Sequence, residues 1–413
     1  MGRDPPTVLL VAESLPFPAV KGGDLRTWQH VNTVACCARV GMFGLCSNDG
    51  RRHSVPLPSL ACWETSTDPA LTAPPPRGVR LDARAWLLHP RGHPSDLYSS
   101  DAAAAELAGL LARLRPEIVV LEGLWLHGYL ETARAAGCRV VLDCHNVEAE
   151  LVEQMAGAST GADLESRVRR DVLPARTAAL ERGAVGAVDQ LWVCSQNDAR
   201  VLRERYAPSA PIFVIPNGIQ PDDYDPGARK AGEPGAPPTL VFPAFFGHPP
   251  NLVGARFLIE EVLPALVRRC GDGRLVLAGA MPADELAAAA ARDPRIVVTG
   301  AVRDIRPYLA AATAMAVPLF QGSGTRFKIL EGFAAGLPVI STRKGAEGLA
   351  ARDGEHLILA ETADDFADAA LGLVRDPERA GDLARRARSY AVERHSWTAI
   401  APRVREAIAA LEA

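Results

Sequence analysis

The stretch Gly-Ser-Gly-Thr-Arg-Phe-Lys-Ile-Leu-Glu-Gly-Phe-Ala-Ala-Gly-Leu-Pro-Val-Ile, residues 322–340, decides the fold of its part of the chain. The glycines at 322 and 324 permit a tight turn, and the apolar spacing that follows them predicts a helix that starts directly after the turn. Gly336 and Pro338 end this helix, and the apolar residues after Pro338 begin a buried strand. A glycine-rich turn, a helix and a buried strand in succession are typical of parallel α/β domains.

The same stretch predicts an anion site. The free N–H groups and the dipole at a helix N-terminus favour phosphate. Arg326 and Lys328 stand in the first turn, where the dipole disfavours cations, so an anionic ligand explains them better than helix stability does. Glu331 follows about one turn later, within reach of a group attached to the phosphate. The alternative interpretation is that these residues form an ordinary connection of an α/β domain and that the basic side chains are simply solvated.

Strands and helices alternate along the whole chain, which predicts an α/β fold with parallel sheets. A helix is expected over about residues 25–39, after the first strand, and irregular structure over residues 48–96. With 413 residues, the chain is long enough for two cores of about 200 residues each. The predicted strands are residues 7–12, 118–121, 139–142, 190–194, 211–215, 239–242, 274–278, 296–299, 314–318 and 339–342.

Composition excludes several classes of protein. A net charge of −4 gives no basis for nucleic-acid binding. The eight cysteines show neither a Cys-x-x-Cys pair nor regular spacing with histidine, which favours free thiols in a reducing cytoplasm over disulfides or a metal site. No apolar run approaches the ~18 residues that a membrane span needs. We therefore expect a cytoplasmic protein without a transmembrane segment or a bound metal.

Polar residues at the end of the strand over residues 139–142 are the first catalytic candidates. Asp143, His145 and Asn146 follow that strand, and ligands of parallel sheets lie outside the carboxyl ends of the strands. A histidine that titrates near neutrality can accept or donate a proton, and Asp143 could fix its tautomer. A buried core histidine is the alternative, and His127 is the next candidate among the histidines.

The loop after the first strand carries Lys21, Gly22 and Gly23. Two adjacent glycines let a ligand approach the backbone amides, although a structural turn would explain them as well.

These motifs resemble those of GT-B glycosyltransferases of family 4. The resemblance rests on the glycine-rich turn, on Thr-Arg-x-Lys-Ile-Leu-Glu and Gly-x-Pro-Val-Ile in residues 325–340, and on the Asp-x-His-Asn element in the first half. It implies two Rossmann-like domains that face a cleft. In the family, the helix start and the basic residues hold the diphosphate of a nucleotide-sugar, and the helix glutamate holds the ribose. Ser323 departs from the glutamate that many members carry there.

Carried over residue by residue, the resemblance gives the donor and acceptor candidates. Asp143 and His145 are the catalytic candidates, and Lys21, His127 and Asn146 lie on the acceptor side. The donor-binding candidates are Gly22, Gly23, Arg303, Ser323, Gly324, Thr325, Arg326, Lys328 and Glu331.

The resemblance also implies the domain boundaries and the reaction. Residues 1–212 would form the acceptor domain and residues 213–388 the donor domain, with residues 389–413 returning to the first domain as a C-terminal helix. The expected activity is transfer, with retained configuration, of a sugar from a UDP- or GDP-linked donor to a small soluble acceptor. Neither a cofactor nor a metal is expected, and an oligomer is possible. A sugar-nucleotide epimerase and a catalytically silent nucleotide-binding partner of another transferase are the alternatives.

Overall fold

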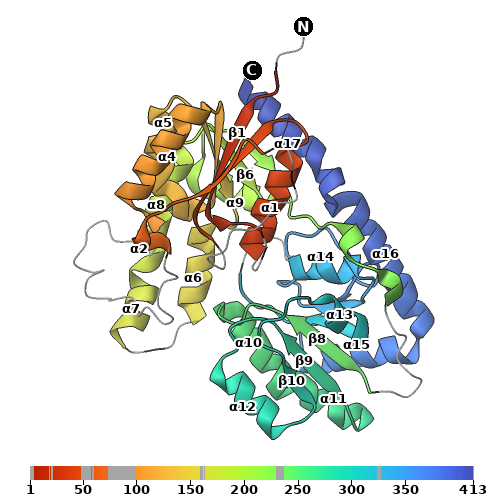
Figure 1. Ribbon diagram of the computed structural model, residues 1–413. Helices are drawn as coiled ribbons and strands as arrows, with labels where there is room; N and C mark the ends of the chain where they lie inside the picture. Colours follow the sequence, from red (N-terminus) through yellow and green to blue (C-terminus); the bar gives the residue numbers. More distant parts are fainter. Residues whose placement is uncertain are drawn as a thin grey trace. The chain divides into compact units, whose positions relative to one another are not determined.

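The computed structural model describes residues 4–17, 19, 22–47, 57, 60–72, 98–158, 161, 163–228, 237–322 and 327–412. The chain forms two compact units (Figure 1). Unit 1 comprises Met1–Pro216 together with Ile400–Ala413, and unit 2 comprises Asn217–Ala399. The first boundary follows Pro216, four residues after the expected one at residue 212. The second follows Ala399, eleven residues after the expected one at residue 388. Each unit has its own parallel sheet and its own core, which confirms the predicted α/β fold class.

Unit 1 contains a seven-stranded parallel sheet in the order β3-β2-β1-β4-β5-β6-β7. Its central strands are short apolar runs, as expected where both faces of a sheet are covered. The strands are β1 Thr7–Leu15, β2 Arg39–Ser47, β3 Cys62–Thr65, β4 Ile118–Glu122, β5 Arg139–Cys144, β6 Gln190–Val193 and β7 Ile212–Val214.

Helices cover both faces of this sheet, because successive strand residues point to opposite sides. Leu9 and Val11 pack among buried residues of α4, α5, α8 and α9, whereas Val8 and Leu10 pack among those of α1 and α17. The helices that contribute to unit 1 are α1 Gly22–Val34, α2 Pro69–Thr72, α4 Asp101–Leu114, the 3-10 helix η2 Leu124–Tyr129, α5 Leu130–Ala135, α6 Glu148–Ala158, α7 Leu164–Asp171, α8 Leu173–Gly186, α9 Gln196–Tyr206 and α17 Trp397–Glu412.

Unit 2 contains a six-stranded parallel sheet in the order β10-β9-β8-β11-β12-β13. The strands are β8 Thr239–Pro243, β9 Arg274–Ala278, β10 Ile296–Val298, β11 Ala314–Val317, β12 Val339–Ser341 and β13 Ile358–Leu359. The helices are η3 Pro221–Asp223, η4 Pro226–Ala228, α10 Pro249–Phe257, the π-helical turn η5 Leu258–Val262, α11 Leu263–Cys270, α12 Asp284–Arg292, α13 Arg306–Ala311, α14 Phe327–Ala334, α15 Ala363–Arg375 and α16 Pro377–His395.

Two predictions for the first 100 residues were wrong. The helix expected over residues 25–39 runs from Gly22 to Val34, and Arg39 already begins β2. The residues between the helix and the strand, 35–38, are all apolar, so periodicity did not mark the end of the helix. Within the region expected to be irregular, the structure contains β3 and α2, both of only four residues. Such short elements on a sheet edge carry little periodic signal.

The last helix joins unit 1 although it follows unit 2 in the sequence. The buried side chains of α17 are Ile400, Val404, Ala407 and Ile408, which share a core with β1 and β6. Gln190 in β6 donates a hydrogen bond of 2.9 Å to the carbonyl of Ala407. Among the described residues, the structure contains no helix that is both long and apolar enough to cross a membrane.

Candidate functional site

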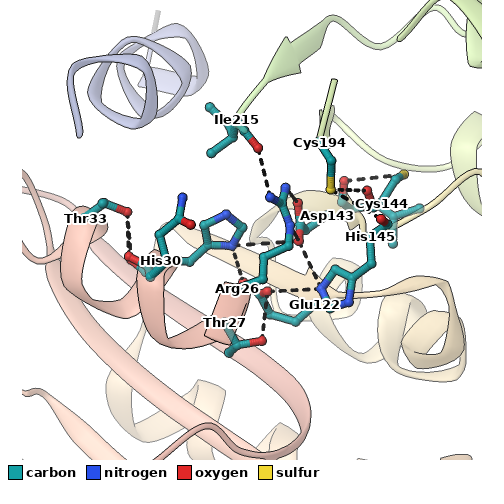
Figure 2. Close-up of polar contacts among 12 residues, drawn as sticks. Arg26, Thr27, His30, Thr33, Glu122, Asp143, Cys144, His145, Cys194 and Ile215 are labelled. Atoms are coloured by element: carbon teal, nitrogen blue, oxygen red, sulfur yellow. Dashed lines mark hydrogen bonds and ion pairs between the residues drawn. The ribbon is translucent and has the colours of Figure 1, made fainter. Parts of the chain in front are cut away.

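Unit 1 brings charged side chains together at the carboxyl ends of its central strands. Strand order reverses between β1 and β4, the position where open α/β sheets bind ligands. Glu122 ends β4, Asp143 lies near the end of β5, and both side chains are buried. Arg26 and His30 reach them from α1 and are themselves almost fully buried. We call Arg26, His30, Glu122, Asp143 and His145 the charge cluster (Figure 2).

Arg26 forms the central ion pair of the charge cluster. Its Nε donates to Oδ2 of Asp143 at 2.7 Å and its Nη2 to Oδ1 at 2.5 Å. Its Nη1 donates to the carbonyl of Ile215 at 2.9 Å. Burial alone would raise the pKa of Asp143, but the adjacent guanidinium holds it well below its ordinary range. Asp143 is therefore a fixed carboxylate.

Glu122 accepts from α1 through both carboxylate oxygens. His30 Nδ1 lies 2.9 Å from its Oε1, and the Thr27 hydroxyl donates to its Oε2 at 3.1 Å. Burial alone would raise the pKa of Glu122, but His30 and His145 favour its ionised form and lower it. A second fixed carboxylate thus lies next to Asp143, from the adjacent strand.

His145 lies where the charge cluster reaches the protein surface. Its Nε2 is 3.1 Å from Oδ2 of Asp143 and 3.5 Å from Oε2 of Glu122, and its side chain is 24% exposed. Burial lowers the pKa of His145, but these two carboxylates outweigh burial and raise it from 6.5 to about 9. The expectation of a histidine that titrates near neutrality is therefore wrong, because two carboxylates face the ring. Near neutral pH His145 is therefore a cation that is paired by charge with both carboxylates.

The Gly22-Gly23 loop begins α1 and lies against this imidazole. A Cβ placed on Gly23 would lie 3.8 Å from Cε1 and Nδ1 of His145. The structure therefore brings three predicted features together in unit 1: the glycine pair, Asp143 and His145.

The charge cluster does not make a suitable metal site. Ligand atoms of His30, Glu122 and Asp143 lie within 4.8 Å of one another. However, Arg26 donates to both oxygens of Asp143, so a metal ion would lie beside a fixed positive charge. The two carboxylates are instead balanced by Arg26 and by protonated His145.

Asn146 contacts Glu148, a carboxyl group outside the charge cluster, and Glu181 lies beside the same helix start. Asn146 donates to Oε1 of Glu148 at 3.0 Å, and burial raises the pKa of Glu148 to about 7. Glu181, from α8, accepts hydrogen bonds from the backbone N–H groups of Glu148 and Ala149 at 2.7 and 3.2 Å. Glu181 thus caps the N-terminus of α6, and Glu148 is a buried acid within reach of protonation at neutral pH.

Unit 2 carries two of the expected donor residues, Lys328 and Glu331, on α14. Strand order reverses between β8 and β11, and α14 follows β11 at that point. The side chain of Lys328 donates to Oδ1 of Asn251 at 2.9 Å, and its Nζ lies 4.4 Å from the ring centre of Phe242. Asn251 is itself oriented by a bond to the carbonyl of Phe245 at 2.8 Å. Lys328 is thus held beside the loop that follows β8.

Glu331 lies one turn after Lys328 on α14, where its Oε1 accepts a hydrogen bond of 3.0 Å from the hydroxyl of Tyr224. Burial raises the pKa of Glu331, and the bond from Tyr224 and the charge of Lys328 oppose this rise.

Other predicted residues lie elsewhere. Arg303 is exposed in the loop between β10 and α13, and His127 lies in η2 and is not a member of the charge cluster. Lys21, Ser323, Gly324, Thr325 and Arg326 lie outside the residues that the structure describes.

Several neighbours of the site were missed from sequence. His30 lies four residues after Arg26, so both point from one face of α1, and Glu122 ends β4 as the register partner of Asp143 near the end of β5. These two spacings could have indicated the charge cluster. Tyr224 and Asn251 gave no such signal, because they reach α14 from segments that are distant in sequence.

Family comparisons match both units. The sequence model for "Glycosyl transferase 4-like domain" matches residues 34–218, and the one for "Glycosyl transferases group 1" matches residues 237–376. D-inositol 3-phosphate glycosyltransferase of Mycobacterium avium is 32% identical over 246 residues, which are 54% of this chain and 55% of that protein. Phosphatidyl-myo-inositol mannosyltransferase of Mycobacterium leprae is 29% identical over 196 residues, 46% of this chain and 51% of that protein. The matched segments thus span about half the length of these relatives.

Solved structures share the fold. A sucrose-phosphate synthase from Thermosynechococcus elongatus has a TM-score of 0.74 at 17% identity and covers 99% of both chains. Anabaena HepE in complex with UDP-glucose has a TM-score of 0.68 at 13% identity and covers 98% of this chain and all of that one. The two parallel sheets with their helices confirm the expected GT-B fold. The chain therefore belongs to the group 1 glycosyltransferases, a family of transferase enzymes with the GT-B fold.

Proposed function

We propose that this protein transfers a sugar, with retained configuration, from a UDP- or GDP-linked donor that unit 2 binds. The observation that carries the proposal is the pairing of Lys328 and Glu331 one turn apart on α14, near the start of that helix. The cation suits a diphosphate, and the partly buried carboxylate suits ribose hydroxyls.

Departure of the nucleoside diphosphate leaves negative charge on its outer phosphate. The N-terminus of α14 and Lys328 would stabilise that charge, as fixed dipoles and cations do in a preorganised site. We propose that this arrangement needs no metal ion. The two carboxylates of the charge cluster are buried and engaged by Arg26 and by two histidines, so neither is placed to attack a sugar, and departure and attack on the same face of the sugar is the mechanism we propose.

His145 is proposed to contact the transferred sugar or the acceptor. Because two carboxylates hold it protonated, it would donate a hydrogen bond to a sugar or acceptor oxygen rather than act as the base. Asp143 and Glu122 would then be positioning residues that keep the imidazolium charged and oriented.

The proposed acceptor is a small molecule with free hydroxyl groups. The curated relatives are named for inositol 3-phosphate and phosphatidyl-myo-inositol, which share a ring of hydroxyls. Inositol phosphates, small natural-product alcohols and simple sugars therefore form the first acceptor panel.

One assay separates the alternatives. Purified protein is incubated with UDP- and GDP-sugars, with and without the acceptor panel, and the products are identified by mass spectrometry and NMR. A glycosylated acceptor with the anomeric configuration of the donor supports the proposal. Conversion of the donor sugar without an acceptor would indicate an epimerase. Nucleotide binding without any turnover would indicate a silent partner.

A further inference from the structure

The carboxylate of Glu331 is oriented by a hydrogen bond from the hydroxyl of Tyr224. The hydroxyl donates to Oε1 at 3.0 Å, and none of the described residues donates to Oε2. Lys328, one turn earlier on α14, donates its described hydrogen bond to Asn251. The orientation of this carboxylate in the structure therefore depends on a tyrosine that lies 107 residues earlier in the sequence.

Tyr224 is itself fixed by the backbone around it. Its N–H donates to the carbonyl of Pro221 at 3.1 Å, and its ring packs against the core of unit 2. Arg388, from α16, donates both to the carbonyl of Tyr224 at 3.4 Å and to the carbonyl of Ala334 at the end of α14. One side chain thus ties the Tyr224 segment to the helix that carries Glu331. The hydroxyl is a rigid donor rather than a mobile surface group.

We infer that Tyr224 is a positioning residue that sets the preference of the donor site for ribose over deoxyribose. This inference rests on the proposed function, in which Glu331 accepts hydrogen bonds from ribose hydroxyls. With Oε1 held by Tyr224, the carboxylate is oriented and Oε2 is left to accept from the ligand. Without the hydroxyl, the carboxylate can rotate and one of its oxygens loses its bond, so the ribose contact weakens while the diphosphate contact does not change.

The test compares ligands that differ only at the ribose. Binding of UDP, GDP and their 2′,3′-dideoxy forms is measured by calorimetry for the wild-type protein, Tyr224→Phe and Glu331→Ala, with inorganic pyrophosphate as the probe for the phosphate contact. Tyr390→Phe is the matched control, because Tyr390 lies in the same unit and its hydroxyl faces His395 at 3.4 Å. Melting temperatures establish that each variant is folded.

In Tyr224→Phe, we expect the preference for the ribo form to fall about fivefold or more, the equivalent of one lost hydrogen bond, with unchanged pyrophosphate affinity. Acidification should also weaken UDP or GDP binding at a higher pH than in the wild-type protein, because loss of the donated bond makes the Glu331 carboxylate easier to protonate. Tyr390→Phe should keep the wild-type preference.

Other outcomes distinguish the role of Tyr224 from the proposed ribose contact of Glu331. An unchanged ribose preference in Tyr224→Phe, or an equal loss for nucleotide and pyrophosphate, would overturn the role of Tyr224. An unchanged preference in Glu331→Ala would instead overturn the placement of the ribose on α14, and the role of Tyr224 with it. Both proposals would also be overturned if the wild-type protein bound neither UDP nor GDP.

Discussion

The polar residues at the two sheet reversals are held in different ways. In unit 1, Arg26, Asp143, Glu122 and His30 contact one another, and their side chains are almost fully buried. In unit 2, Lys328 and Glu331 are only partly buried, and their described hydrogen bonds go to neutral side chains, Asn251 and Tyr224. The first arrangement belongs to the core of its unit, and the second remains partly exposed to solvent. Substitutions in the charge cluster should therefore reduce stability first, and those on α14 should reduce binding first.

Breaking the central ion pair should have the largest effect. Arg26→Ala leaves the buried Asp143 carboxylate without its cation, at an expected cost of about 3–5 kcal/mol in the stability of unit 1. Hydrogen exchange of unit 1 peptides in increasing urea measures this loss locally. Arg113→Ala is the matched control, since its ion pair with Glu64 is exposed and should contribute little. Similar protection in both variants would show that the charge cluster does not determine the stability of the unit.

Glu148 should make unit 1 less stable as the pH rises. Its pKa is about 7 in the folded protein against 4.5 ordinarily, so between these values the folded state binds the extra proton and stability falls with increasing pH. Glu148→Gln should remove that dependence and stabilise the protein at pH 8 by up to about 3 kcal/mol. Thermal melts of both proteins from pH 4.5 to pH 8 measure the difference. Parallel curves would contradict the assignment.

Removing the imidazolium of His145 should lower the turnover rate more than the affinity for the nucleotide. His145→Ala should lower turnover by about 10²-fold or more, with nucleotide affinity barely changed. In the wild-type protein, protonated His145 stabilises the fold fully below pH 6.5, and this contribution is lost as the pH rises through about 9. The variant should lack that decline. A folded, donor-binding variant with near-normal turnover would remove His145 from the catalytic group and favour the Glu122–His127 segment.

Substitutions on α14 should weaken donor binding by about 1–3 kcal/mol each. Lys328→Ala removes a charge from the proposed diphosphate contact, and Glu331→Ala removes the proposed ribose acceptor. Calorimetric titration with UDP and GDP measures both. Arg274→Ala is the control, because this exposed cation begins β9, at the end of the sheet opposite the site. If neither α14 variant changes the affinity, the donor site lies elsewhere.

Chelation should have the smallest effect. Activity is expected to survive EDTA, because the helix dipole and Lys328 take the role that a metal ion has in other transferase folds. Turnover is measured before and after dialysis against the chelator. Loss of activity that Mg²⁺ or Mn²⁺ restores would show that the α14 site needs a metal.

Sequence patterns predicted the architecture well because parallel strands are short apolar runs between helices of regular period. They placed Asp143 and His145 at a strand end and Lys328 and Glu331 on one helix, since local spacing fixes such positions. They did not reveal the neighbours that determine chemistry. The protonation of His145 depends on Asp143 and also on Glu122 from the adjacent strand, and the contact with Glu122 requires the sheet order as well as local spacing.

The core of unit 1 is completed by α17, a helix that is synthesised after unit 2. Residues 400–412 are synthesised after all of unit 2, yet they cover the face of the first sheet that carries Val8, Leu10 and Trp192. During translation, α1 can already pack on that apolar face, but the part that α17 covers stays exposed while the second sheet is being made and folded. A ribosome-bound intermediate of this chain would therefore be a substrate for chaperones on its N-terminal side, although N-terminal domains usually finish first.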